Sequence, residues 1–289
     1  MSMQWRSGLA AAAALMGLAA LAAAQDEPIK PVPVEVREVV FVQPIGDLIG
    51  IKVQNPAGQD LGKVEDLVVQ PDGDITFAVL AFDAKIRNDA KLVPIPWLLV
   101  DLEPEKGIVQ LQVKPERLIE APGFARANWP DMHKANVFQD SREYFADERT
   151  NAGAAVLASA KRDKPGVVFR GSELKGYAVQ NAKGEKLGEI REIAIDPSAA
   201  RLNFFVLSVG SVLGEGAKNI AVPWAALNLK PDPDNPQINR LMLATDKEKL
   251  MAAPVFEAPG GSWAEVANPK WIGTVYHYFE VEPYWKTRK

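Results

Sequence analysis

The stretch LIGIKVQNPAGQDLGKVEDLVVQP, residues Leu48–Pro71, decides the fold because it occurs twice in the chain. Its second copy, LKGYAVQNAKGEKLGEIREIAIDP, spans Leu174–Pro197, so equivalent positions differ by 174 minus 48, or 126. An internal repeat of this kind indicates a duplicated structural unit. In a chain of 289 residues, longer than one average domain, it predicts two domains of one architecture.

The composition is that of a soluble globular protein, with 47% hydrophobic and 24% charged residues. A net charge of -4, with Lys and Arg scattered, lacks the basic footprint of a nucleic-acid-binding protein, so we expect no nucleic-acid partner. The chain has no cysteine, which excludes disulfides, thiolate catalysis and Cys-zinc sites.

Residues 1–24 have the pattern of an export signal. Arg6 precedes an apolar run from Gly8 to Leu21, and Ala22–Ala24 supply small residues before Gln25. We expect cleavage there, release into the periplasm or the medium, and no transmembrane segment in the mature chain. An uncleaved anchor is the alternative, and it would also place the bulk of the chain outside the cytoplasm.

The mature chain divides at shifts in composition. Residues 25–43 hold three prolines in PIKPVPVEV, which predicts an extended spacer. The first unit with its tail helix spans 44–147, a linker rich in Ala, Asn and Gly spans 148–166, and the second unit with its tail helix spans 167–289.

Two strands of each unit depart from a simple alternation of apolar and polar residues. Val64, Leu67 and Val69 are spaced by three and then two, and the second copy repeats this spacing, which predicts a β-bulge at Glu65–Asp66 and its equivalent. The next strand, Asp74–Phe82, is apolar on both faces and must be covered on both. The amphipathic tails, which are the cover we expect, lie within Asn128–Phe145 and Ser262–Phe279.

A further matched motif is KLVPIPWLLVDL, which returns as KNIAVPWAALNL. With the Leu-x-Gly start, the Gly-x-x-Leu-Gly turn and Val-x-Pro-Asp-Gly, it resembles the PRC-barrel family. The resemblance covers Ile45–Phe124 well and Glu173–Phe256 more loosely. It implies a mainly β fold with minor α: two small PRC-type β-barrels in tandem, each followed by a tail helix. The motif positions that we expect to be structural are Gly50, Gly62, Pro96, Trp97, Gly176, Gly188, Pro223 and Trp224.

The resemblance also implies a barrel used for protein contacts, without a family-wide catalytic residue. The residues themselves give little indication of a catalytic or metal-binding site. His133 and His277 are not equivalent and favour surface or packing roles, while Asp232–Asn235 reads as a hairpin loop better than a calcium loop. Gly210–Gly216 predicts a flexible hairpin tip, and Glu65–Asp66 a solvated face. We predict no catalytic residue, no cofactor and no metal site.

Aromatic residues near the C-terminus are the remaining signal: Tyr276, Tyr284 and Trp285 predict an exposed contact surface. The leading hypothesis is an exported, non-enzymatic interaction or scaffold module of the cell envelope with an unidentified protein partner. One alternative is a protein that binds a small ligand or metal in a cleft between the barrels. Another is an enzyme whose site is assembled from scattered residues.

Overall fold

The computed structural model describes residues 42–86, 88–103, 106–134, 136–146, 168–210, 218–231, 239–256, 263 and 268–287. The predicted signal, most of the spacer, the linker, the Asp232–Asn235 loop and most of Gly210–Gly216 lie outside these residues. Val36–Lys289 forms one compact unit, to which all described residues belong.

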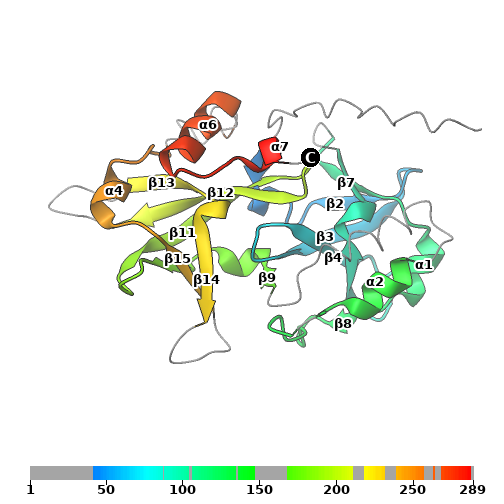
Figure 1. The fold of residues 1–289 in the computed structure, drawn as a ribbon. Helices are drawn as coiled ribbons and strands as arrows, with labels where there is room; N and C mark the ends of the chain where they lie inside the picture. The colour runs from blue at the N-terminus through cyan, green and yellow to red at the C-terminus, as the bar shows by residue number, and fades with distance from the viewer. Residues whose placement is uncertain are drawn as a thin grey trace, which may run out of the picture. The chain divides into compact units, whose positions relative to one another are not determined.

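The first repeat is a curled sheet in the order β6-β7-β2-β3-β4-β5-β8 (Figure 1). Parallel pairing of β2 with β7 joins an early strand to a late one, as a barrel requires. The strands are β2 (Lys52–Gln54), β3 (Asp60–Val69), β4 (Ile75–Phe82), β5 (Lys91–Pro96), β6 (Val100–Glu103), β7 (Ile108–Leu111) and β8 (Phe124–Ala125).

The second repeat has the equivalent order β13-β12-β11-β10-β15-β14, with β10 parallel to β15. Its strands are β10 (Ala178–Gln180), β11 (Lys186–Asp196), β12 (Arg201–Val209), β13 (Lys218–Pro223), β14 (Leu227–Pro231) and β15 (Asn239–Leu243). The expected fold, two small β-barrels in tandem, is confirmed.

Local structure follows the sequence signals closely. The pairing of β3 with β4 shifts between Val64 and Asp66, and that of β11 with β12 between Ile190 and Glu192, so both predicted bulges are present. Further short elements of the barrels include the 3-10 turns η2 (Trp97–Leu99) and η4 (Trp224–Ala226) and the helices α1 (Pro115–Glu120) and α4 (Lys247–Met251). Asp246 caps α4, because its carboxylate accepts from the Lys249 N–H at 2.8 Å.

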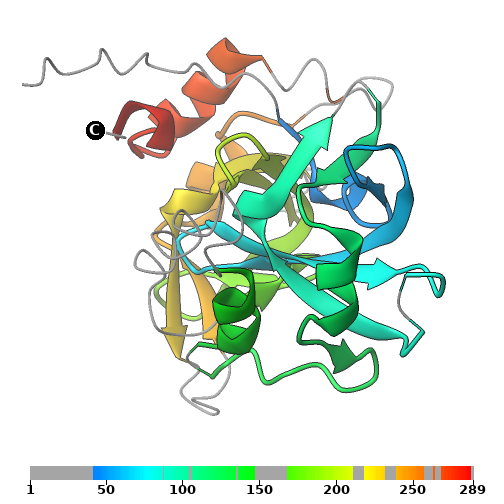
Figure 2. The same cartoon turned by 90° about the vertical axis from the view of Figure 1, so that its right-hand side faces the viewer.

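The tail helices cover the two-sided strands. α2 (Gln139–Phe145) packs on β5, and α6 (Pro269–Tyr278), followed by α7 (Tyr284–Thr287), packs on β13, so each lies on its own barrel. Both α1 and α2 face the viewer in Figure 2. Phe204 and Val206 of β12 are buried against Val275 of α6, outside the barrel core. The prediction that the tails cover the outer face of this strand is therefore confirmed.

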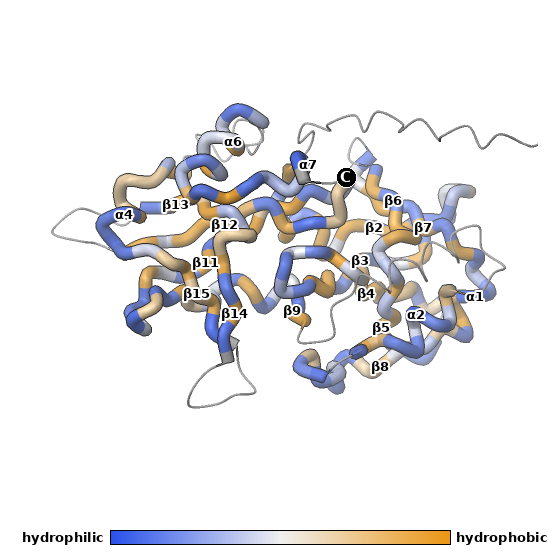
Figure 3. Tube along the Cα trace, in the orientation of Figure 1, coloured by the Kyte–Doolittle hydropathy of each residue, from blue (hydrophilic) through white to orange (hydrophobic). Residues whose placement is uncertain are grey.

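The core follows from this arrangement. β12 is largely orange in Figure 3, because its side chains are apolar on both faces. One contiguous cluster of buried apolar side chains includes members from both repeats, such as Leu67, Ile75, Leu202 and Trp224. The repeats therefore share a core, which includes the place where they meet.

Candidate functional site: the joint between the repeats

Each repeat begins with a short arm. Arm 1 is Val42–Leu48 and contains β1 (Gln43–Pro44) and the 3-10 turn η1 (Ile45–Asp47). Arm 2 is Val168–Leu174 and contains β9 (Phe169–Arg170) and the 3-10 turn η3 (Gly171–Leu174). Val42 and Gln43, the last residues of the predicted spacer, therefore belong to the fold.

The two arms pair reciprocally with the opposite repeat. β1 runs antiparallel to β11 with Gln43 opposite Ile195, and β9 runs antiparallel to β3 with Phe169 opposite Val69. Both pairs of equivalents differ by 126, since 169 minus 43 and 195 minus 69 give this value. The joint between the repeats therefore has approximate two-fold symmetry.

The hairpin tips of the two repeats also meet. The Ile75 N–H donates to the Ala200 carbonyl at 2.7 Å, and the Leu202 N–H donates to the Gly73 carbonyl at 2.8 Å. Gly73 has a φ of +93°, and a Cβ there would lie 2.6 Å from Cδ1 of Trp224. A glycine is therefore required at this turn on two grounds, its backbone conformation and the close approach of the indole ring.

The two tryptophans of the Pro-Trp motifs bridge the repeats. The Trp97 indole N–H donates to the Pro197 carbonyl at 3.3 Å, and that of Trp224 donates to the Pro71 carbonyl at 3.0 Å. Trp97 is 8% exposed and Trp224 is 1% exposed. These side chains therefore hold the opposite repeat as well as packing in their own.

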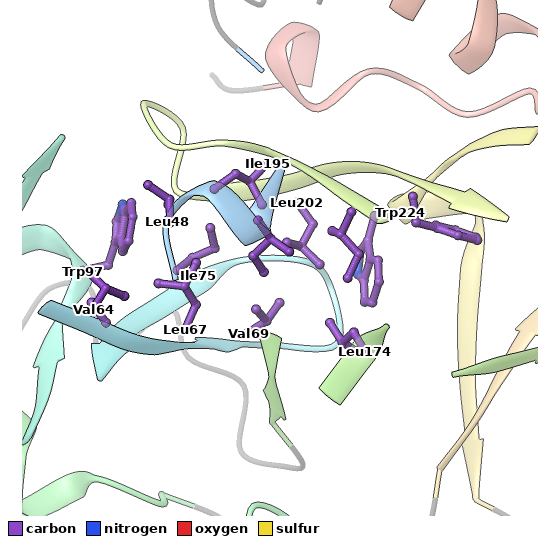
Figure 4. Packing of buried hydrophobic residues seen from close by; sticks show 14 of the residues in the cluster. Leu48, Val64, Leu67, Val69, Ile75, Trp97, Leu174, Ile195, Leu202 and Trp224 are labelled. Carbon is purple, nitrogen blue, oxygen red and sulfur yellow. The ribbon is translucent and has the colours of Figure 1, made fainter. Parts of the chain in front are cut away.

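Apolar side chains fill the space between these bridges. Trp97 lies at one end of the cluster in Figure 4 and Trp224 toward the other. The buried residues labelled with them are Leu48, Val64, Leu67, Val69, Ile75, Leu174, Ile195 and Leu202. Shared core thus occupies the place where the alternative hypothesis puts a ligand cleft between the barrels.

Asp66, on the bulge of β3, is the polar anchor of arm 2. Its side chain is 0% exposed, so the predicted solvated face is wrong for this residue. Its carboxylate accepts from the Ser172 hydroxyl at 2.6 Å, the Ser172 N–H at 2.9 Å and the Arg170 Nε at 3.0 Å. The Arg170 guanidinium also lies 3.9 Å from the centre of the Trp129 ring. A buried carboxylate is tolerated here because donors from the other repeat satisfy it.

The equivalent position on β11 carries a different arrangement. Glu192 forms an ion pair with Lys175 at 2.6 Å, and both side chains are partly exposed. Partial shielding from water raises the pKa of Asp47 above its usual value, the nearby Glu192 carboxylate raises it further, and Lys175 opposes the shift. Arm 1 has Pro44 where arm 2 has Arg170, so it lacks an equivalent of the ion pair between Arg170 and the buried Asp66.

The repeated glycines of the motif have defined structural roles. A Cβ on Gly62 or Gly188 would lie 2.1 or 2.3 Å from a carbonyl oxygen of the adjacent strand. Gly50 and Gly176 have φ values of +89° and +82°, in the left-handed region that favours glycine.

Comparison with protein-family models agrees with the observed architecture. The PRC-barrel domain model matches residues 44–117 and again residues 166–240, which is just over half of the chain. The chain belongs to the PRC-barrel domain family. A comparison with curated proteins found no match. Each match begins in or just before an arm, so the second PRC barrel, like the first, includes the segment that pairs with its neighbour.

The aromatic surface predicted near the C-terminus is corrected. In the second PRC barrel Tyr276 is 1% exposed and Tyr284 is 8% exposed, while Trp285 is partly buried. The Tyr284 hydroxyl donates to the Asp196 carboxylate at 2.8 Å, and the Tyr276 hydroxyl donates to the Asn203 carbonyl at 2.8 Å. These rings are inward because they close the outer face of the barrel, so Tyr276 and Tyr284 are not surface contacts.

A surface groove remains beside the tail of the second PRC barrel. It has a volume of about 500 Å³ and lies between α6, α7 and the segment that connects them. Its lining includes Lys270, Gly273, His277, Glu280, Trp285 and Lys286. His277 is exposed on α6, whereas His133 lies on repeat 1, exposed, with its Nδ1 3.3 Å from the Asp131 carboxylate.

Two features are absent from the part of the chain that the structure describes. There, no three His, Asp or Glu side chains gather as ligands of one metal ion. None of its helices is long and apolar enough to cross a membrane.

Proposed function

We propose that the chain is an exported, non-enzymatic protein whose two PRC barrels act as one interaction or scaffold module in the cell envelope. The observation that carries this proposal is the joint. Asp66, Trp97 and Trp224 use their hydrogen bonds to hold the opposite repeat, so the barrels present their outer surfaces as one body. The export pattern of residues 1–24 supports the location in the periplasm or outside the cell.

Exposed apolar side chains favour the first barrel as the contact side. Among the described residues, Leu98 of η2 is 50% exposed and Ile119 of α1 is 53% exposed. The second barrel carries the small Ala225 at the position equivalent to Leu98, also exposed. Exposed large apolar side chains are typical of protein-contact surfaces when they gather in patches. The two residues are therefore the first positions to test.

The test is recovery of a partner by the tagged full-length protein after cross-linking in its own cell envelope. Wild type should recover a defined protein, and Leu98→Asp or Ile119→Asp should reduce that recovery. Ala225→Asp, which places the same charge at the equivalent site of repeat 2, is the matched control and should not. Equal recovery by all four proteins, or no partner with any of them, would contradict the proposal.

The groove beside α6 supports a second candidate, the binding of a small ligand. Gly273 lines the groove and a Cβ on it would meet no atom within 4 Å, so Gly273→Leu would start a larger side chain from open space at the groove. Ligands and divalent metals are screened by thermal shift against wild type and this variant. A shift present in wild type and lost in the variant supports the groove as the site. A response that the substitution leaves unchanged excludes it.

A further inference from the structure

Two equivalent residues of opposite charge face each other at the joint. The second repeat has one extra residue after Pro197, so Asp74 corresponds to Arg201, as Trp97 does to Trp224. Asp74 and Arg201 are bridge partners, and the Arg201 Nε lies 3.0 Å from an Asp74 carboxylate oxygen. Two copies of repeat 1 joined in this way would oppose two aspartates, and two copies of repeat 2 would oppose two arginines.

The meeting point of the arms shows the same complementarity in shape. Ile45 of arm 1 and Gly171 of arm 2 are equivalent, since they differ by 126. A Cβ on Gly171 would lie 2.6 Å from the Ile45 Cδ1, so the isoleucine fills the space that the glycine leaves. Two isoleucines would overlap there, and two glycines would leave a void.

The buried carboxylate adds a third restriction. Asp66 is satisfied by Arg170 and Ser172 of arm 2, whose equivalents in arm 1 are Pro44 and Gly46. Neither has a side-chain donor, so a pair of first repeats would leave Asp66 buried with fewer hydrogen bonds. The indole hydrogen bonds of Trp97 and Trp224 are equivalent, one from each repeat to the other. They stabilise the joint, but they do not favour a pair of unlike repeats over a pair of like repeats.

We propose that the joint accepts only unlike repeats, with Ile45–Gly171 and Asp74–Arg201 as the residue pairs that determine this specificity. The partner that fits an opened joint is then the opposite repeat of a second copy of this chain. Two copies can close by reciprocal exchange, each first barrel resting on the other copy's second barrel. This inference does not depend on an external partner or on the proposed function.

The test uses two full-length variants that make the joint alike on both sides. Variant A carries Asp74→Arg and Gly171→Ile, and variant B carries Ile45→Gly and Arg201→Asp. Within either chain, charges repel and the arms overlap or leave a void. Across a mixed dimer both joints regain the complementary pairs. We expect a dimer containing one A and one B chain, detected by native mass spectrometry and size-exclusion chromatography, and little dimer from either variant alone.

A chain with all four substitutions is the matched control, because its internal joint is complementary again, and it should stay monomeric and melt above A and B. If A and B do not fold separately, two milder variants replace them: Gly171→Ala alone, and Gly171→Ala combined with Ile45→Val, which removes the Cδ1 that the new methyl group would meet. The second variant should recover melting temperature that the first loses. Equal dimerisation of A alone, B alone and the mixture, or no recovery in the compensated chains, would overturn the proposal.

Discussion

Trp97 and Trp224 occupy equivalent positions in the two repeats, and each donates its indole N–H to a carbonyl of the opposite repeat. The acceptors, Pro197 and Pro71, are equivalent residues that follow β11 and β3, so the bonds form a reciprocal pair across the joint. A residue that would anchor one barrel in a single-barrel protein here also links two. The stability of each repeat therefore depends on the other.

Trp97→Ala and Trp224→Ala should each destabilise the whole molecule and not one barrel. Truncating a buried Trp costs about 3–5 kcal/mol in free energy of unfolding. We expect a single urea transition, shifted to lower urea, with fluorescence and far-UV circular dichroism coinciding. Leu98→Ala, next to Trp97 but half exposed, is the control and should change little. Two separate transitions in either tryptophan variant would show that the joint does not couple the repeats.

Asp66→Asn should cost far more stability than Glu192→Gln, although the two residues are equivalent. Asp66 is buried and bonds Arg170 and Ser172 across the joint, and breaking such a buried charged cluster costs about 3 kcal/mol or more. The ion pair of Glu192 with Lys175 is partly exposed, and pairs of this kind contribute about 0–1 kcal/mol. Urea titration of both variants measures the difference. Equal losses of unfolding free energy would mean that Asp66 and Glu192 contribute equally to stability, despite their different burial.

The duplicated fold was predictable because its signals are local. Each of these signals acts within one barrel: the glycines in tight turns, the bulge spacing and the Pro-Trp motif. Because every one of them occurs in both repeats, each copy supports the interpretation of the other. The two-sided strand beginning at Asp74 also required a cover, which the tails provide.

The joint was not predictable in this way, because its contacts connect residues about 100 to 150 positions apart. Nothing near Asp66 in the sequence indicates the Arg170 and Ser172 donors. One signal was available: Asp74 and Arg201 are equivalent and oppositely charged. The extra residue after Pro197 hides that correspondence unless the repeats are aligned with a gap. Tyr276 and Tyr284 are buried although the sequence predicts them on the surface, because proximity to the C-terminus in sequence does not report burial.

Asp47→Asn should stabilise arm 1 at neutral pH and have less effect in acid. Partial shielding and the Glu192 carboxylate raise the pKa of Asp47 in the folded chain, with Lys175 opposing the shift. A raised pKa means that the folded state favours the protonated carboxyl, so the contribution of Asp47 is most favourable at low pH and is lost as pH rises through the folded-state pKa. The gain from removing the charge should be below about 1 kcal/mol, as for other exposed charges.

Unfolding free energies of wild type and Asp47→Asn at pH 7 and near pH 4 test this expectation. The difference between the two proteins should shrink at the lower pH. Asp60→Asn, on β3 and outside the joint, is a control that removes one carboxylate without touching Glu192. An Asp47→Asn protein that is less stable than wild type at pH 7 would mean that the Asp47 carboxylate is stabilised in the fold, contrary to its surroundings.

Tyr284→Phe should destabilise the second barrel through its buried polar cluster. The Tyr284 hydroxyl donates to Asp196 at 2.8 Å and accepts from the Asn203 side chain at 3.1 Å. Removing it leaves both groups buried with one hydrogen bond fewer, which costs about 1–3 kcal/mol.

Burial and the Asp196 carboxylate raise the pKa of Tyr284, so in wild type its phenol should ionise only at strongly alkaline pH. Thermal melting measures the first effect, and phenolate absorbance during an alkaline titration measures the second. Trp285→Phe, which changes the neighbouring ring without entering this hydrogen-bonded cluster, should melt closer to wild type. A Tyr284→Phe protein as stable as wild type would show that Asp196 finds its stabilisation elsewhere, from Ser198 and the Ala199 N–H alone.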